Sequence, residues 1–376
     1  MPTVNRTGRL LSSGTLLFLT TILFLSPAPA FAQSVPQAQL VIKYSYFSDN
    51  QSIFFGASEG NTTPQTLVTY KQGVTERVEV NAHYGVDGVT SATWRVDGVT
   101  GATPATQWEY RHEGGLGATY TSGVNVFGIS GGVSREPNYN SDFATLSVQR
   151  EFFERNTTLG LAYTINRDEI DTLKIADTRP FPQDVSLDAV VVTVAQVLSP
   201  KMVAQGNVYW ARQQGYLAHP ENIVTNSDGT WSEEVHPTER QRAAMVGRLI
   251  RYFESRSALH THYRYYRDTW GISSHTAGAS WYQYFGDFWV GRLEYRWYDQ
   301  SGADFWVVSP DPAAGFKTID GKLRPFRAHL YGIKVSTSAW QLPWFDRTEF
   351  NAKIDAYEQR PGLNAKVIEV GLMTRF

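Results

Sequence analysis

Two short copies of one sequence contain the hydroxyl groups that are best suited to chemistry in this chain. Residues 87–93 read Asp-Gly-Val-Thr-Ser-Ala-Thr, and residues 97–103 read Asp-Gly-Val-Thr-Gly-Ala-Thr. Each copy ends on a threonine, Thr93 or Thr103, whose hydroxyl oxygen can accept a phosphoryl group. The small residues that precede each threonine would give a modifying enzyme access to it. The two copies therefore predict candidate sites of covalent modification.

Both copies resemble the D-x-x-(S/T)-(S/G)-A-T sequence on which flavin transferases attach FMN through a phosphoester. The resemblance implies Thr93 and Thr103 as acceptors, covalent FMN as a cofactor and a flavin transferase as a partner. A conformational interpretation competes with it, because Asp-Gly pairs are common in hairpin turns and Thr, Ser, Ala and Gly recur in surface loops. We favour a tight structural loop over residues 88–106.

The elements around this motif follow a period of two residues. Residues 76–87 alternate Val78, Val80, Ala82 and Tyr84 with charged or polar residues, and similar runs recur to the end of the chain. One face of such a strand suits lipid and the other suits a polar lumen. We count about sixteen strands, an even number that is typical of bacterial outer-membrane barrels. The sequence therefore predicts an all-β fold, an antiparallel transmembrane β-barrel.

Both ends of the chain support export to an outer membrane. Residues 367–376 form an alternating strand that stops on Phe376, and this pattern resembles the terminal strand by which outer-membrane barrels are recognised for insertion. Arg6 and Arg9 precede an apolar stretch at residues 16–25, and Ala30-Phe31-Ala32 provides a cleavage site. We expect a signal peptide at residues 1–32, cut after Ala32, and a barrel domain at residues 33–376. The expected location is the outer membrane of a Gram-negative bacterium.

The composition agrees with a barrel and excludes several classes of site. Aromatic residues make up 14 % of the chain, and the mean hydropathy is −0.32, which suits aromatic girdles around a wet interior. The chain has no cysteine, which excludes disulfides and thiolate metal sites. The net charge of −2 gives no basic footprint, so nucleic acid is not an expected partner.

The connections between strands predict an orientation. Short turns fall near residues 73–75, 121–123, 154–157, 199–201, 254–257 and 286–287, whereas long polar connections fall at residues 50–64, 88–106, 168–184, 216–238 and 300–323. Bacterial barrels have short periplasmic turns and longer extracellular loops. The long connections, including the repeated motif, are therefore expected outside the cell.

Other candidate residues have structural interpretations that we favour. His260 and His262 share one strand face and could bind a metal, but histidines that line a lumen and form hydrogen bonds are more common. Carboxylates on the strands and loops face arginines such as Arg150, Arg242, Arg251, Arg267 and Arg292. They can form a ladder of opposite charges across strands that plugs the lumen or sets its ion preference, but we favour a solvated wall. No serine and histidine pair resembles the arrangement of the barrel lipases. Aromatic clusters beside turns, such as residues 281–285, 288–289 and 340–345, fit interfacial belts.

The repeated motif, the aromatic alternating body and the terminal phenylalanine together resemble a family of uncharacterised bacterial outer-membrane β-barrels with an early D-x-x-S-G-A-T/S stretch. The doubled copy departs from that family, in which the motif occurs once. The resemblance implies flavin-transfer and thioredoxin-like partners and hence redox work.

We expect a channel, or a scaffold for a periplasmic partner, without a catalytic centre of its own. Its expected partners are outer-membrane lipid and the barrel-assembly machinery. The alternative is a redox-associated barrel with covalent FMN on an extracellular loop, which passes electrons to a periplasmic redox protein.

Overall fold

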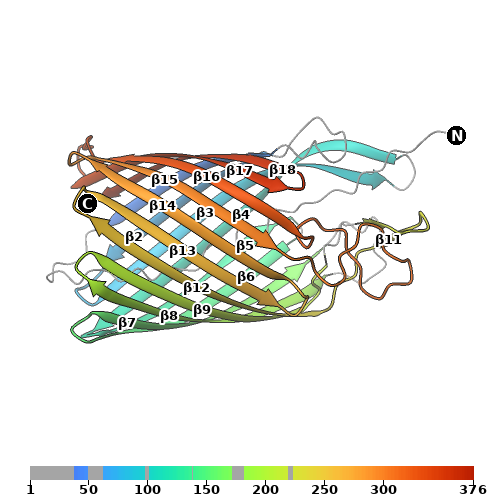
Figure 1. Cartoon of the computed structure of the whole chain (residues 1–376), viewed down its shortest axis with the longest axis horizontal. Coiled ribbons are helices and arrows are strands. Elements are labelled where there is room, and N and C mark those ends of the chain that lie inside the picture. The colour runs from blue at the N-terminus through green and yellow to red at the C-terminus, as the bar shows by residue number, and fades with distance from the viewer. Residues whose placement is uncertain (1–37, 50–61, 98–100, 138, 172–181, 219–222) are drawn as a thin grey trace.

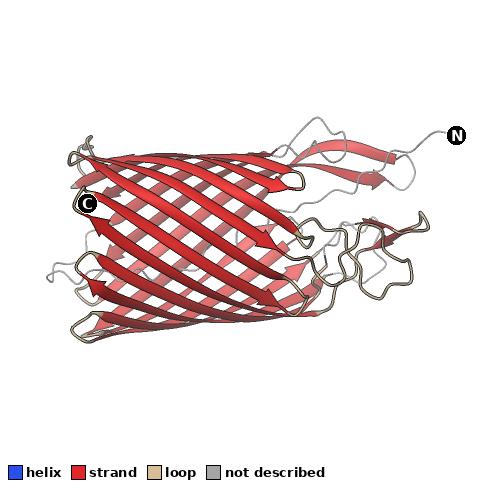
Figure 2. Cartoon of the chain, in the orientation of Figure 1, coloured by secondary structure: helices blue, strands red, loops and turns tan. Residues whose placement is uncertain are grey.

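The strands of this chain close into one antiparallel barrel (Figures 1 and 2). The structure is a computed structural model, and it describes residues 38–49, 62–97, 101–137, 139–171, 182–218 and 223–376. The barrel has 16 strands, which confirms the predicted fold class and strand number. No helix in these residues has the length and apolar character needed to cross a bilayer.

Neighbours in the barrel are also neighbours in the chain, apart from one excursion between β9 and β12 that carries a separate two-stranded sheet. The barrel strands are β1 (Gln39–Asp49), β2 (Thr62–Gly73), β3 (Val78–Asp97), β4 (Gly101–Ser122), β5 (Asn125–Glu136), β6 (Tyr139–Phe152), β7 (Thr157–Ile170), β8 (Gln183–Ser199), β9 (Met202–Gly215), β12 (Glu239–Phe253), β13 (Ser257–Asp268), β14 (Ser273–Phe285), β15 (Trp289–Gln300), β16 (Phe326–Thr337), β17 (Arg347–Arg360) and β18 (Leu363–Arg375). The separate sheet pairs β10 (Ile223–Thr225) with β11 (Trp231–Glu233).

The first and last strands close the barrel. Strand β1 pairs with β18 along its whole length, from Gln39 opposite Arg375 to Asp49 opposite Ala365. This pairing leaves the sheet without a free edge, so every strand finds hydrogen-bond partners on both sides. The C-terminal residue extends the closure, because the amide of Phe376 donates to the carbonyl oxygen of Ala38.

The alternation along each strand separates two faces, as the sequence predicts. Three isoleucines on neighbouring strands, Ile333, Ile354 and Ile368, lie opposite one another and are exposed on the outer face. On either side of Ile354 in β17, Lys353 and Asp355 face the lumen. They form an ion pair with each other. A concave inner wall crowds its side chains, and the polar set is accordingly the more buried one, with Asp355 at 5 % exposed.

The two ends of the barrel differ in their connections. At one end the turns are short, at residues 74–77, 123–124, 153–156, 200–201, 254–256 and 286–288, and glycines with positive φ, Gly123 and Gly286, form two of them. We call this the turn end. The C-terminus lies there, while the long connections at residues 216–238 and 301–325 project from the other end, the loop end (Figure 1). The predicted asymmetry is confirmed for these segments, but each end has exceptions. Residues 338–346 form a longer connection at the turn end, and residues 269–272 and 361–362 are tight connections at the loop end.

One predicted loop is wrong. We expected an irregular connection at residues 88–106, but β3 continues to Asp97 and β4 begins at Gly101. The two strands stay paired from Val78 opposite Tyr120 to Asp97 opposite Gly101, and the hairpin extends beyond the barrel at the loop end (Figure 1). Its alternating Val and Thr residues favour extended backbone, which outweighs the turn tendency of the first Asp-Gly pair.

Two adjacent residues of β5 test the assignment of faces. Ile129 is exposed on the outer face, and Ser130 faces the lumen between Gly117 and Thr145. We expect Ile129→Arg to lower the free energy of unfolding in lipid vesicles by about 2–4 kcal/mol, because it places a charge in hydrocarbon. Ser130→Arg adds the same side chain to the wet face and is expected to cost far less. Equal losses in a urea titration would contradict this assignment.

Candidate functional site

The two motif copies both lie in the β3–β4 hairpin. Thr93 is opposite Ala105, and Thr103 is opposite Arg95, so the candidate acceptors occupy paired strands at the loop end. The side chains of Thr93 and Thr103 lie outside the described residues, and their modification stays a prediction. The structure brings no other predicted site residue to this hairpin.

The histidines on strands divide between the two faces, which corrects our expectation that they line the lumen. His83, His260 and His262 face the lumen. His112 and His329 lie on the outer face near the loop end, and each imidazole Nδ1 shares a hydrogen bond with a tyrosine hydroxyl on the neighbouring strand. These outer pairs, with that of His275, are Tyr84–His112 at 2.9 Å, Tyr263–His275 at 2.6 Å and Tyr295–His329 at 2.9 Å. They form a polar and aromatic belt at that rim.

His260 and His262 share the lumen face of β13, as predicted, but each packs against a different neighbour. The ring of His260 lies 4.5 Å from the ring of Tyr282, centroid to centroid, and the ring of His262 lies over Gly278. Among the described residues there is no group of three or more His, Cys, Asp or Glu side chains that could hold a metal ion.

Opposite charges pair at several places on the lumen wall. Ion pairs cross from one strand to the next between Lys71 and Glu79 at 2.8 Å and between Arg111 and Asp87 at 2.8 Å. Two others join residues of one strand, Arg292 with Glu294 at 2.8 Å and Lys353 with Asp355 at 2.6 Å. Three of the arginines considered for a ladder fall on the outer face near the strand ends, namely Arg150, Arg251 and Arg267. The pairs in the lumen neutralise part of its charge and hold the long side chains along the wall.

Glycines on the lumen face flatten this wall further. A Cβ atom added to Gly115 would lie 2.4 Å from Cε1 of His83, which shows that the imidazole occupies the space a side chain would fill. The same arrangement recurs where a polar side chain on the next strand lies over a glycine: Asn81 over Gly117, His262 over Gly278, Asp355 over Gly332 and Asn351 over Gly371. Sequence analysis missed this feature, although glycines at lumen positions of the alternating strands were a signal for it.

The lumen wall remains accessible to water along the barrel. The Lys71 side chain is 48 % exposed, and those of His83 and Glu113 are 29 % and 28 % exposed, although all three point inward. The clusters of buried large apolar residues in the described part of the chain lie at the loop end and not between the strands at mid-barrel. The wall is therefore a polar, solvated surface.

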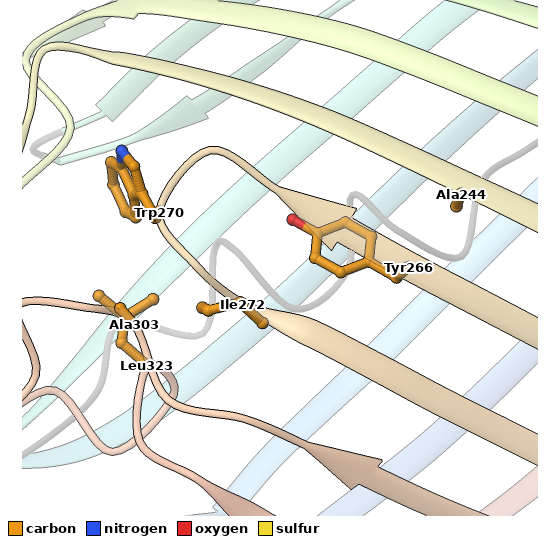
Figure 3. Packing of buried hydrophobic residues seen from close by; sticks show 6 residues of the cluster. All are labelled: Ala244, Tyr266, Trp270, Ile272, Ala303 and Leu323. Carbon is orange, nitrogen blue, oxygen red and sulfur yellow. The ribbon is translucent and has the colours of Figure 1, made fainter.

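Part of the loop end is covered by a cap, which we define as residues 217–218, 223–238 and 301–325. Its segments pair with each other between Val235 and Lys317, and its apolar residues pack onto the barrel rim. Ala303 and Leu323 of the cap lie beside Trp270 and Ile272 of the β13–β14 connection, near Tyr266 (Figure 3). Ala218 packs with Ile170 and Val185, so the cap rests on strands β6 to β15 at the barrel mouth.

The interior of the cap is dry and contains charged groups. Glu234 is fully buried, accepts a hydrogen bond from the Thr318 hydroxyl and lies 3.1 Å from Nε2 of His236. Burial raises the pKa of the Asp320 carboxyl, an effect that the nearby Lys322 ammonium opposes. Buried polar groups of this kind fix the cap in one arrangement, because each group would lose its partner in any other arrangement and remain unpaired away from water.

The predicted aromatic belt lies at the turn end. Phe285, Phe288, Trp340 and Trp344 are exposed beside the turns, and the rings of Trp289 and Trp340 meet edge to face with centroids 6.1 Å apart. Together with the Tyr–His pairs near the loop end, this belt brackets the apolar outer face.

Comparison with known proteins identifies one family model and several structures of similar fold. The model described as "Protein of unknown function (DUF3570)" matches residues 39–373. A search of curated proteins finds no match. A bacterial polysaccharide outer membrane secretin superposes with a TM-score of 0.49 at 10 % identity, over 91 % of this chain and 99 % of that one. OccD3 (OpdP) of Pseudomonas aeruginosa gives 0.46 at 9 % identity, over 92 % and 94 %. A loop L8 deletion mutant of OmpT from Vibrio cholerae gives 0.45 at 7 %, over 90 % and 99 %.

The flattened wall leads to a prediction about its open cross-section. Gly115→Val would displace the His83 imidazole into the lumen, so we expect a lower single-channel conductance in planar bilayers. Gly247→Val is the matched control, because Gly247 faces outward and a Cβ there meets no atom within 4 Å. Adding His83→Ala to Gly115→Val is expected to restore the conductance. Equal conductance of Gly115→Val and the unaltered chain would show that the wall does not limit the pore.

Proposed function

This chain belongs to the DUF3570 family of proteins of unknown function, and we propose that it acts as a water-filled channel through the outer membrane of a Gram-negative bacterium. The observation that carries the proposal is the accessibility of inward-facing charged side chains, with Lys71 48 % exposed inside a closed wall. A filled barrel would bury such groups. Rings of polar and charged side chains around a wet lumen are what a solute pathway requires.

The remaining features support the same proposal. Ion pairs along the wall and glycine positions keep long side chains against it, which widens the passage. The cap packs on the mouth over β6 to β15. In this proposal the outer face contacts lipid, and the barrel-assembly machinery recognises the terminal strand that ends at Phe376. The scaffold for a periplasmic partner is the variant of this proposal in which the short-turn end provides the contact.

Conductance tests the channel directly. We expect the refolded chain to produce discrete current steps in planar lipid bilayers in potassium chloride, because the wet lumen is continuous with both bath solutions. Chain that is denatured and added without refolding is the control for detergent artefacts. Absence of current from protein that shows the β-sheet circular dichroism of a folded barrel would refute the channel and leave the scaffold.

A second candidate function rests on a separate observation, the pairing of both motif copies in one hairpin. We propose as the alternative that Thr93 or Thr103 carries covalent FMN and that the barrel passes electrons to a periplasmic redox protein. The hairpin holds the two candidate residues in paired strands at the loop end, beyond the barrel wall. A flavin at that site would lie outside the lumen and would not obstruct a channel.

Intact-mass measurement tests this alternative. After co-expression with a flavin transferase, we expect the mass to rise by one FMN-derived group, because the threonine hydroxyl takes the phosphoryl group. Thr93→Ala and Thr103→Ala, made separately and together, identify the acceptor by loss of the added mass. Thr119→Ala removes a threonine from the barrel wall of β4 and serves as the control. An unmodified chain under these conditions would exclude the flavin function.

A further inference from the structure

We propose that the lumen wall of strands β12 to β15 contains an anion site centred on Gly278, which favours solutes that carry a carboxylate or phosphate group. This inference rests on the channel function proposed above and deepens it by assigning a class of solute. The site consists of His262, Arg264 and Arg296 around Gly278, with Arg248 at its margin. We call this set the anion site.

Strand register brings these residues together. Arg248 of β12 lies directly opposite His262 of β13, and His262 lies opposite Gly278 of β14. Gly278 in turn lies opposite Arg296 of β15. Directly opposed residues of antiparallel strands have Cα atoms about 4.5–5.5 Å apart, so the row forms one continuous band across the wall. The residues come from four consecutive strands of the chain.

Gly278 provides the floor of the site. A Cβ atom at this position would lie 2.3 Å from Cε1 of His262, so the imidazole fills the notch that the glycine leaves and lies against the wall. Arg296 is the residue opposite Gly278 on β15, and Thr276 and Ser280 place hydroxyl groups on either side along β14. The imidazole in the notch is thus flanked by hydroxyl groups and a guanidinium that can donate hydrogen bonds to a solute in the lumen.

Positive charge around the notch exceeds the negative charge. Arg264 and Arg296 form no ion pair within the described part of the chain, and the Arg264 guanidinium instead lies 5.0 Å from the centre of the Tyr266 ring. The carboxylate on this part of the wall, that of Glu294, pairs with Arg292 at 2.8 Å. A guanidinium that is partly withdrawn from water gains most from a bound oxyanion, which it can hold through two parallel hydrogen bonds.

The opposite wall leaves room for a solute at this level. Strands β4 and β5 stand halfway around the barrel order from β14 and β15. Their inward residues at mid-barrel are small, namely Gly115, Gly117, Gly128, Ser130 and Gly132. Side chains of the neighbouring strands lie over three of these glycines, His83 over Gly115, Asn81 over Gly117 and Phe143 over Gly132. A solute at the basic wall therefore faces side chains that lie flat along the opposite wall.

Ion selectivity tests the inference. In a potassium chloride gradient across a planar bilayer, we expect a reversal potential that favours chloride, and we expect Arg296→Gln with Arg264→Gln to shift it toward potassium. Lys71→Gln is the matched control for the single variant Arg296→Gln, because each removes one lumen cation, and Lys71 lies on β2, where it pairs with Glu79. Inorganic phosphate is expected to reduce the chloride current, and the concentration for half block should rise about tenfold in Arg296→Gln, the effect of losing one charge-assisted contact.

A second variant and a second measurement keep the inference separate from the channel itself. Gly278→Val retains every charge but displaces the His262 imidazole from the wall. We expect it to weaken phosphate block while the folded barrel keeps its heat-modifiable migration in gel electrophoresis. Calorimetric titration of the detergent-purified barrel with phosphate and with acetate measures binding without any current.

A conducting barrel with no chloride preference and no response to Arg296→Gln would overturn the anion site and leave the channel. A barrel that conducts no ions but binds phosphate in an Arg296-dependent manner would overturn the channel and retain the site, and absence of both would overturn both.

Discussion

Backbone hydrogen bonding in hydrocarbon is the constraint on which the rest of this structure depends. Hydrocarbon contains no water that could form hydrogen bonds with the unpaired amides and carbonyls of an edge strand, so the sheet must close. The pairing of β1 with β18, from Gln39 opposite Arg375 to Asp49 opposite Ala365, meets that requirement. Because closure permits only two faces, each residue of a barrel strand is assigned to lipid or to the lumen by its position alone, and a shift of one residue would exchange the two sets.

The same two-face rule explains why the candidate functional surface is a wall and not a pocket. Residues that meet at Gly278 come from separate strands, and only the register of three consecutive pairings places Arg248, His262 and Arg296 in one row. The lumen can carry such charges because water and neighbouring carboxylates solvate them, as the ion pairs of Arg292 and Lys353 with residues of their own strands illustrate. The residues of this candidate surface are therefore brought together by pairing between strands and not by a motif along one strand.

The hairpin of β3 and β4 and the cap mark the limits of local reasoning. The Asp-Gly pairs of the repeated motif suggested an irregular loop, yet the strands remain paired to Asp97 and Gly101, because continued pairing with an existing strand outweighs the turn preference of one dipeptide. The cap unites residues 217–218 and 223–238 with residues 301–325, and no local pattern connects Glu234 with Thr318. We also expected the histidines on strands to line the lumen. His112 and His329 instead lie on the outer face, where each shares a hydrogen bond with a tyrosine.

The amino-acid sequence by itself determined the closed antiparallel barrel, its strand number and the difference between its short and long connections, because period-two alternation and turn composition are local properties. The outward row of Ile333, Ile354 and Ile368 follows from the same pattern. Only the tertiary structure decided which inward residues are neighbours, which glycines receive a side chain from the next strand and which loops join over the mouth. The physical reason is that register and loop packing depend on the summed energy of contacts between distant segments, whereas a period of two fixes the face of a residue and says nothing about its partner across the strand.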